Sequence, residues 1–157
     1  MKEDEKMEVS STKDYELIAT LNKTVHELHV QLYPEYFKEY HFENVKSFFE
    51  GLIQKDNQLF LIIKREDEAL GYAWIELKDY PENVFKKGYK SVYVHQLNVL
   101  RPNQGLGSLL MDKIYEIAKE QKIKLVELDY WADNHAAERF YHKQGFTKYR
   151  EFLYRDL

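Results

Sequence analysis

The chain of 157 residues contains no cysteine, and this absence excludes several kinds of site. Disulfide scaffolds, cysteine-ligated zinc, iron–sulfur clusters and cysteine nucleophiles all need the thiol group. No apolar run approaches the roughly 18 residues that a bilayer-crossing helix requires. The segment 1–9 is charged where a secretory leader would be apolar. The sequence therefore predicts a cytoplasmic protein with no membrane partner.

A strong charge of one sign is also missing. Lys and Arg total 23 against 27 Asp and Glu, for a net charge of −4. Because a basic excess is what draws proteins to nucleic acid or anionic lipid, we expect no nucleic-acid partner. Apolar residues make up 44% of the chain and aromatic residues 15%, enough for a packed core. We predict one domain over residues 1–157, with residues 1–6 disordered.

No metal site is predicted. The segment His26-Glu27-Leu28-His29 is one residue short of the HExxH zinc motif. His135 and His142 lie close together in the sequence, but no carboxylate or third histidine completes a ligand set. A solvated helix face explains these histidines better than a metal ion does.

Apolar periodicity predicts the order strand, helix, helix, three strands, helix, strand, helix, strand. This order indicates a mixed α/β class with α+β character and with helices on both faces of the sheet. Asp14 is the expected cap of the first helix and Pro34 its expected stop. The other predicted helices span 43–54, 106–120 and 134–143, the strands 7–9, 59–64, 70–77, 91–99, 124–131 and 146–154, and a loop 80–90.

Two of the six glycines lie between a predicted strand and a predicted helix, in the turn 104–108. Unpaired N–H groups at a helix start carry the positive end of the helix dipole, and glycine lets a phosphate approach them. The turn is therefore a candidate diphosphate site; the alternative is a strand–helix turn that simply favours glycine. The spacing fits neither the P-loop nor the Rossmann pattern, whose third glycine position holds Leu110.

A second motif, N-x-x-A-x-x-F-Y-x-x-x-G-F, occupies the last predicted helix. Asn134 can cap this helix, and Gly145 can end it in the left-handed conformation. Asn134 and Tyr141 lie near the same helix face, so both can face one cleft. The alternative is a capped helix with ordinary core aromatics.

Taken together, the two motifs resemble the GNAT superfamily of acetyl-coenzyme A-dependent N-acetyltransferases. The resemblance is close over about residues 91–157 and extends to the earlier half in element order only. It implies the GNAT fold, a twisted, mostly antiparallel sheet that splays between two neighbouring strands. It also implies an acyltransferase that moves an acetyl group from acetyl-CoA, a co-substrate, to a primary amine. The amine, on a small molecule or a peptide, attacks directly in a ternary complex.

The same resemblance implies particular site residues. In the family the glycine turn binds the coenzyme diphosphate through backbone amides, and the preceding strand pairs with the pantetheine arm. An Asn contacts the pantetheine region, and a Tyr protonates the departing thiolate, which makes Tyr141 the general acid. Pro102 departs from the family, which usually has Arg or Gln there. The implied cofactor-binding residues are Leu97, Asn98, Val99, Gln104, Gly105, Leu106, Gly107, Ser108, Asn134, Ala137 and Phe140.

The general base stays open at this point. His95 lies on the predicted strand 91–99 with the same parity as Leu97, where some family members place a catalytic Glu. Histidine suits proton transfer near neutral pH, although a hydrogen-bonded structural His is the alternative. Further candidates are the strand acids Glu76, Glu127 and Asp129.

The acceptor pocket is expected from residues 17–37, the loop 80–90 and the last predicted strand. The sequence allows a homodimer. Two other functions also remain open: a non-catalytic acyl-CoA-binding sensor or partner-binding module on the same fold, and a mononucleotide-binding α/β protein.

Overall fold

The computed structural model describes residues 6–157, whose five strands form one sheet in the order β1-β2-β3-β4-β5. Neighbouring strands are antiparallel, except that β4 and β5 run parallel. The predicted mixed class is therefore confirmed. The strands are β1 (Met7–Ser11), β2 (Gln58–Arg65), β3 (Glu68–Tyr80), β4 (Tyr89–Val99) and β5 (Val126–Leu128).

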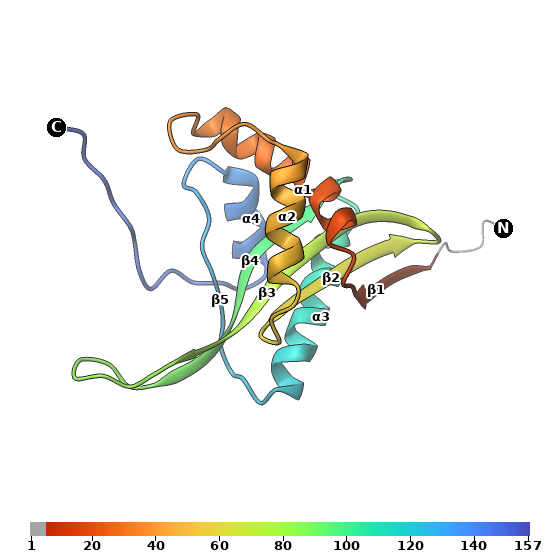
Figure 1. Cartoon of the computed structure of the whole chain (residues 1–157). Coiled ribbons are helices and arrows are strands. Elements are labelled where there is room, and N and C mark those ends of the chain that lie inside the picture. Colours follow the sequence, from red (N-terminus) through yellow and green to blue (C-terminus); the bar gives the residue numbers. More distant parts are fainter. Residues whose placement is uncertain (1–5) are drawn as a thin grey trace.

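Helices cover both faces of the sheet, as predicted (Figure 1). α1 (Tyr15–Leu32) and α2 (Phe42–Leu52) share one core cluster with Phe60, Ile62 and Tyr72 of the sheet. α3 (Leu106–Glu120) packs on the opposite face against Leu61, Ile63 and their neighbours. α4 (His135–Lys143) follows β5. Alternation along β2 thus supplies both cores, because successive strand side chains point to opposite faces.

The helix ends follow local rules that the sequence already shows. Asp14 caps α1 because its Oδ1 accepts a hydrogen bond from the Leu17 N–H at 3.0 Å. α1 ends at Leu32, two residues before Pro34. α3 begins and ends where the periodicity predicts. These boundaries depend only on neighbouring residues, which is why the sequence predicts them well.

Two strand predictions and one loop prediction need correction. The strand predicted over 124–131 is only the three residues of β5. The strand predicted over 146–154 is wrong: the segment is rich in aromatic residues, but its apolar positions do not alternate as a strand with one buried face requires, and it forms no strand. The predicted loop 80–90 is shorter, since β3 and β4 continue to Tyr80 and Tyr89, whose rings stack at 4.4 Å.

The sequence also predicts disorder at the chain start, no membrane-crossing helix and no metal site. Apart from Lys6, the expected disorder of residues 1–6 lies outside the described residues. No helix between residues 6 and 157 combines the length and the apolar character that a membrane crossing requires. Across the same residues, no three His, Asp or Glu side chains gather in a way that could hold a metal ion.

Candidate active site

β4 and β5 stay together over a very short distance. Only three residue pairs join them: Val92 with Val126, Tyr93 with Glu127, and Val94 with Leu128. Beyond these pairs, no strand in the described part of the chain lies beside residues 95–99 on the β5 side of β4. This stretch of β4 therefore has a free edge, as a splayed sheet requires.

The free edge starts at a β-bulge. Ile75 of β3 pairs with Val94, whereas the preceding residue, Trp74, pairs with Gln96. His95 is consequently the extra residue on β4. A bulge of this kind interrupts the alternation of side chains and re-aims those around it.

The bulge places His95 and Leu97 on opposite faces. The ring of His95 stacks on Trp74, with centroids 4.3 Å apart, on the face covered by α1 and α2. Leu97 and Val99 instead pack against the cluster that contains α3. The predicted shared parity of His95 and Leu97 is therefore wrong, because strict alternation assumes an unbulged strand.

A buried polar network holds the bulge in place. Asn22 of α1 donates through Nδ2 to the Tyr72 hydroxyl (3.0 Å) and to Oε1 of Gln96 (3.2 Å). The Tyr72 hydroxyl donates to the same Gln96 oxygen at 2.6 Å. The side chain of Asn98 donates to the Leu21 carbonyl at 2.8 Å. The buried Asn98 side chain thus faces α1, away from the free edge, where its backbone remains for a ligand.

The glycine turn leaves backbone donors unpaired at the start of α3. Gly105 is the N-cap residue with φ 74°, and no side chain caps the helix. The first backbone bond of the helix runs from the Leu109 N–H to the Gly105 carbonyl. The N–H groups of Leu106, Gly107 and Ser108 therefore precede the hydrogen-bond ladder. A Cβ on Gly105 would meet nothing within 4 Å, so the space beside the N-cap residue is open.

The structure brings the two sequence motifs together at Gly107. A Cβ on this residue would lie 3.0 Å from the Phe140 ring of α4 and 3.6 Å from the Leu97 side chain of β4. Nearby, Gln144 donates through Nε2 to the Ser108 hydroxyl at 3.1 Å. α3 and α4 can approach this closely only because residue 107 has no side chain.

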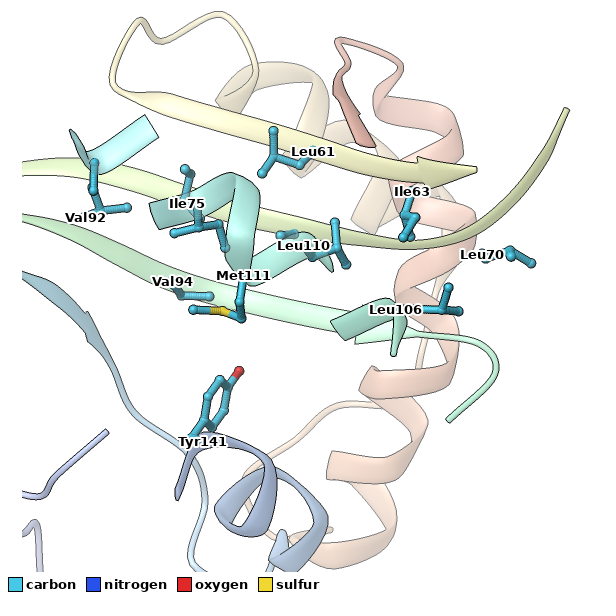
Figure 2. Packing of buried hydrophobic residues seen from close by; sticks show 13 residues of the cluster. Leu61, Ile63, Leu70, Ile75, Val92, Val94, Leu106, Leu110, Met111 and Tyr141 are labelled. Carbon is cyan, nitrogen blue, oxygen red and sulfur yellow. The ribbon is translucent and has the colours of Figure 1, made fainter. Parts of the chain in front are cut away.

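Tyr141 projects from α4 into the apolar cluster, and only 8% of it is exposed. Figure 2 shows its hydroxyl turned toward Met111, on the side where Val94 lies. Burial raises the pKa of Tyr141, so the hydroxyl keeps its proton at neutral pH. The predicted Asn134 cap is present, since its Oδ1 accepts from the Ala137 N–H at 3.2 Å.

His95 lies in a polar arrangement on the other face. Its Nε2 is 3.6 Å from Oε2 of Glu76, and Oε1 of Glu76 accepts from Nε2 of Gln58 at 2.5 Å. Oε1 of Gln58 in turn accepts from the Trp74 indole N–H at 2.7 Å. Burial lowers the pKa of His95, although the Glu76 carboxylate opposes this shift. The imidazole is therefore neutral near pH 7 and can accept a proton.

The other two candidate acids, Glu127 in β5 and Asp129 just after it, already have partners. Asp129 accepts a 2.5 Å hydrogen bond from the Tyr93 hydroxyl, and burial together with this bond raises the pKa of Tyr93. Glu127 is buried and accepts from the hydroxyls of Tyr89 and Tyr149. Among the four candidates, His95 with Glu76 beside it is best arranged for proton transfer.

Two residues near the site were not predicted from the sequence. Arg65, at the end of β2, has its Nη2 3.5 Å from Oε1 of Gln104 in the glycine turn. No local pattern links residues so far apart in the chain. Gln144 bridges Ser108 and the Tyr115 hydroxyl, which donates to its Oε1 at 2.9 Å. Gln144 occupies an unspecified position of the second motif, so the motif alone does not single it out.

The model of the acetyltransferase (GNAT) family matches residues 22–146. The chain therefore belongs to the GNAT acetyltransferase family, as its two motifs indicate.

The relatives agree with this assignment. An "Uncharacterized N-acetyltransferase" of Archaeoglobus fulgidus is 29% identical over 107 residues, which cover 67% of this chain and 71% of that protein. The tetramutant of the BH1408 protein from Bacillus halodurans superposes with a TM-score of 0.88 at 27% identity, covering 97% and 99% of the two chains. The aminoglycoside N-acetyltransferase AAC(6')-Iy, solved with CoA, has a TM-score of 0.72 at 16% identity over 99% and 98%. The last likeness shows the fold alone, and the predicted GNAT fold is confirmed.

Proposed function

We propose that the protein transfers the acetyl group of acetyl-CoA to a primary amine, by direct attack within a ternary complex, and that the chain forms a single acetyltransferase domain. One observation carries this proposal. The free, bulged edge of β4 separates two sets of groups, with the α3 start and Tyr141 on one side and His95 with Glu76 on the other.

The first set suits the coenzyme. Backbone N–H groups of 106–108, with Gln104 and Gly105 leading into them, would hold the diphosphate at the positive end of α3. The free edge of 97–99 would pair with the amide-containing pantetheine arm. Asn134 uses its Oδ1 as a helix cap, which leaves its Nδ2 to donate. Ala137 and Phe140, on the same helix, would line this wall.

The second set suits the amine. A primary amine with a pKa near ~10.4 is mostly protonated at neutral pH, and the carboxylate of Glu76 attracts that cation. A neutral His95 would then accept the amine proton, directly or through a water molecule. Glu76 would stabilise the imidazolium that forms.

Acetyl transfer needs two further contributions. The attacked carbonyl becomes an oxyanion, and one positioned backbone N–H of the β4 edge would stabilise it by roughly 3 kcal/mol. The C–S bond then breaks, and Tyr141 would give its hydroxyl proton to the leaving thiolate. The raised pKa of Tyr141 keeps that proton available in the resting protein.

The acceptor would enter beside the segment after α1. Tyr33 and Phe37 lie against Trp131, with ring centroids 4.5 and 5.1 Å apart. This contact brings the end of the 17–37 region next to the link between β5 and α4, which we add to the proposed acceptor pocket. The last strand expected in that pocket is not formed.

The decisive experiment measures free thiol released from acetyl-CoA with a panel of primary amines, each product checked by mass spectrometry. We expect amine-dependent thiol release and an amine heavier by one acetyl group. Coenzyme binding without turnover on any amine would instead favour a sensor. Tighter binding of ATP or NAD than of CoA in competition would favour a mononucleotide-binding protein.

A further inference from the structure

The two nitrogen atoms of the His95 ring have unequal surroundings. Nε2 is buried, makes no hydrogen bond within residues 6–157, and lies 3.6 Å from Oε2 of Glu76. Nδ1 also lacks a hydrogen-bond partner in these residues, but it is not enclosed as Nε2 is. The His95 side chain as a whole is 25% exposed. Nδ1 is therefore the ring nitrogen that an incoming amine can reach.

The carboxylate of Glu76 decides which of these nitrogens carries the proton. A neutral imidazole has one N–H and one lone pair, whereas an ionised carboxylate can only accept hydrogen bonds. A lone pair on Nε2 would be repelled by the negative Oε2 of Glu76, and an N–H on Nε2 would be attracted to it. Their separation of 3.6 Å is longer than an ordinary hydrogen bond, so a small movement of the ring completes the bond. The neutral ring therefore keeps its proton on Nε2 and its lone pair on Nδ1.

Two further residues fix the orientation of Glu76. The buried Gln58 donates from Nε2 to Oε1 of Glu76 at 2.5 Å and accepts at its own Oε1 from the Trp74 indole N–H at 2.7 Å. Because the indole can only donate and the carboxylate can only accept, the Gln58 amide has one orientation. With its Oε1 held in this way, Glu76 turns Oε2 toward His95. Trp74 also stacks on the imidazole, with the two planes 20° apart. The four side chains thus form a closed circuit.

We propose that Gln58 and Trp74 are positioning residues, which hold Glu76 against Nε2 of His95 and so make Nδ1 the atom that accepts the amine proton. This inference rests on the proposed acetyl transfer. In the step, an N–H bond of the protonated amine breaks and an Nδ1–H bond forms, which leaves the amine lone pair to attack the thioester carbonyl. The imidazolium then carries a proton on each nitrogen, and its positive charge lies beside the Glu76 carboxylate.

The other charges around His95 fix the direction of the expected effect. Glu76 and Lys78 of β3 act on the ring, and so does Asp129, which accepts the hydroxyl proton of Tyr93. The two carboxylates raise the pKa of His95, whereas Lys78, 3.7 Å from Oε2 of Glu76, lowers it. Burial lowers this pKa more than any single charge changes it. A Glu76 that is no longer held in place should therefore lower the pKa of His95 further.

The first test reads the ring nitrogens directly and needs no turnover. In isotope-labelled protein, a long-range proton–nitrogen correlation spectrum distinguishes a protonated from an unprotonated imidazole nitrogen, and His95→Gln identifies the signals of His95. We expect the proton on Nε2 in the natural chain. Gln58→Met has a similar length but no hydrogen bonds, and Trp74→Phe keeps an aromatic ring without the N–H. Both variants should populate the second tautomer and lower the pKa of His95.

The matched control is Gln121→Met, at an exposed Gln that follows α3, and it should change neither the tautomer nor the pKa. Circular dichroism establishes that each variant folds, and Trp74→Phe keeps the test open if Gln58→Met does not. A proton on Nδ1 in the natural chain would overturn the proposal. An unchanged tautomer and pKa in the folded variants would overturn it as well.

The second test follows turnover of an accepted amine against pH. Gln58→Met should lower turnover by about 10-fold or more, the usual contribution of a residue that orients a functional histidine, and should move the acid limb to lower pH. Gln121→Met should do neither. A loss of stability alone would leave the acid limb in place, so an unmoved limb in Gln58→Met would refute the positioning role. Absence of turnover with every amine would instead overturn the proposed function, and the role of Nδ1 with it, even if the tautomer is as expected.

Discussion

At the scale of single residues, the role assigned to Tyr141 depends on one hydroxyl in an apolar setting. Within residues 6–157 the hydroxyl has no hydrogen-bond partner. Its burial therefore does not serve a structural polar contact. A group placed in this way suits proton donation to a ligand that approaches along β4.

Replacing Tyr141 with Phe removes only the hydroxyl. We expect turnover to fall by about 10²-fold or more, the usual contribution of a positioned acid, with little change in CoA affinity. Steady-state kinetics and calorimetric binding measure the two quantities. Tyr130→Phe is the matched control, because the Tyr130 ring stacks with Tyr141 at 6.2 Å. Equal turnover in the two variants would remove Tyr141 as the acid.

The lowered pKa of His95 predicts how turnover depends on pH. Burial holds the pKa of His95 below its ordinary value of 6.5, so the folded protein keeps the imidazole neutral at pH 7. The imidazole gains a proton only as the pH falls through that lowered pKa. Turnover should fall over the same pH range, because a protonated His95 cannot act as the base. His95→Gln should lose this acid limb and show turnover lower by about 10²-fold.

The same lowered pKa also affects stability. The unfolded chain takes up the proton first, so folding stability contributed by neutral His95 is lost as the pH falls below 6.5. Circular dichroism at each pH therefore has to accompany the kinetics. His41→Gln, an exposed His at the start of α2 that makes no cap bond, should keep the acid limb. An unchanged pH profile in His95→Gln would exclude His95 as the base.

At the scale of elements, Gly107 sets the distance between α3 and α4. Gly107→Ala should destabilise the fold by about 1–3 kcal/mol, the usual effect of overpacking, because its Cβ would lie 3.0 Å from Phe140. It should also weaken CoA binding at the neighbouring N–H groups. Gly51→Ala in α2 is the matched control, since its Cβ would meet nothing within 4 Å. The control should stabilise by about 0.5–1 kcal/mol through helix propensity. Urea unfolding measures both changes, and similar effects for the two variants would contradict this packing argument.

Elements also show what the sequence can and cannot predict. The α3 boundaries and the Asp14 and Asn134 caps follow from nearest neighbours, and the sequence predicts them. The sequence does not predict the bulge at His95, because its position depends on the register in which β3 pairs with β4. The aromatic residues of 146–154 favour a strand in propensity, but the segment does not pair with the open edge of β5, and propensity alone does not decide pairing. Glu76 and Trp74, which lie beside His95, meet it only through the sheet register.

At the scale of the whole molecule, the proposed coenzyme binding links folding to ligand concentration. A ligand that binds only the folded chain should raise the unfolding temperature as its concentration rises. Calorimetric scans at several CoA concentrations should show this rise for the natural chain and a smaller one for Gly107→Ala. A midpoint that does not change with CoA would contradict the proposed binding site.

The brief contact between β4 and β5 has a consequence for motion. Because the ladder between these strands has only three residue pairs, the segment with β5 and α4 should open locally more readily than the antiparallel part of the sheet. A coenzyme bound between β4 and the segment with β5 and α4 would contact both and hold them together. Amide hydrogens of β5 and α4 should then exchange with solvent more slowly when CoA is present, while those of β1 and β2 change little.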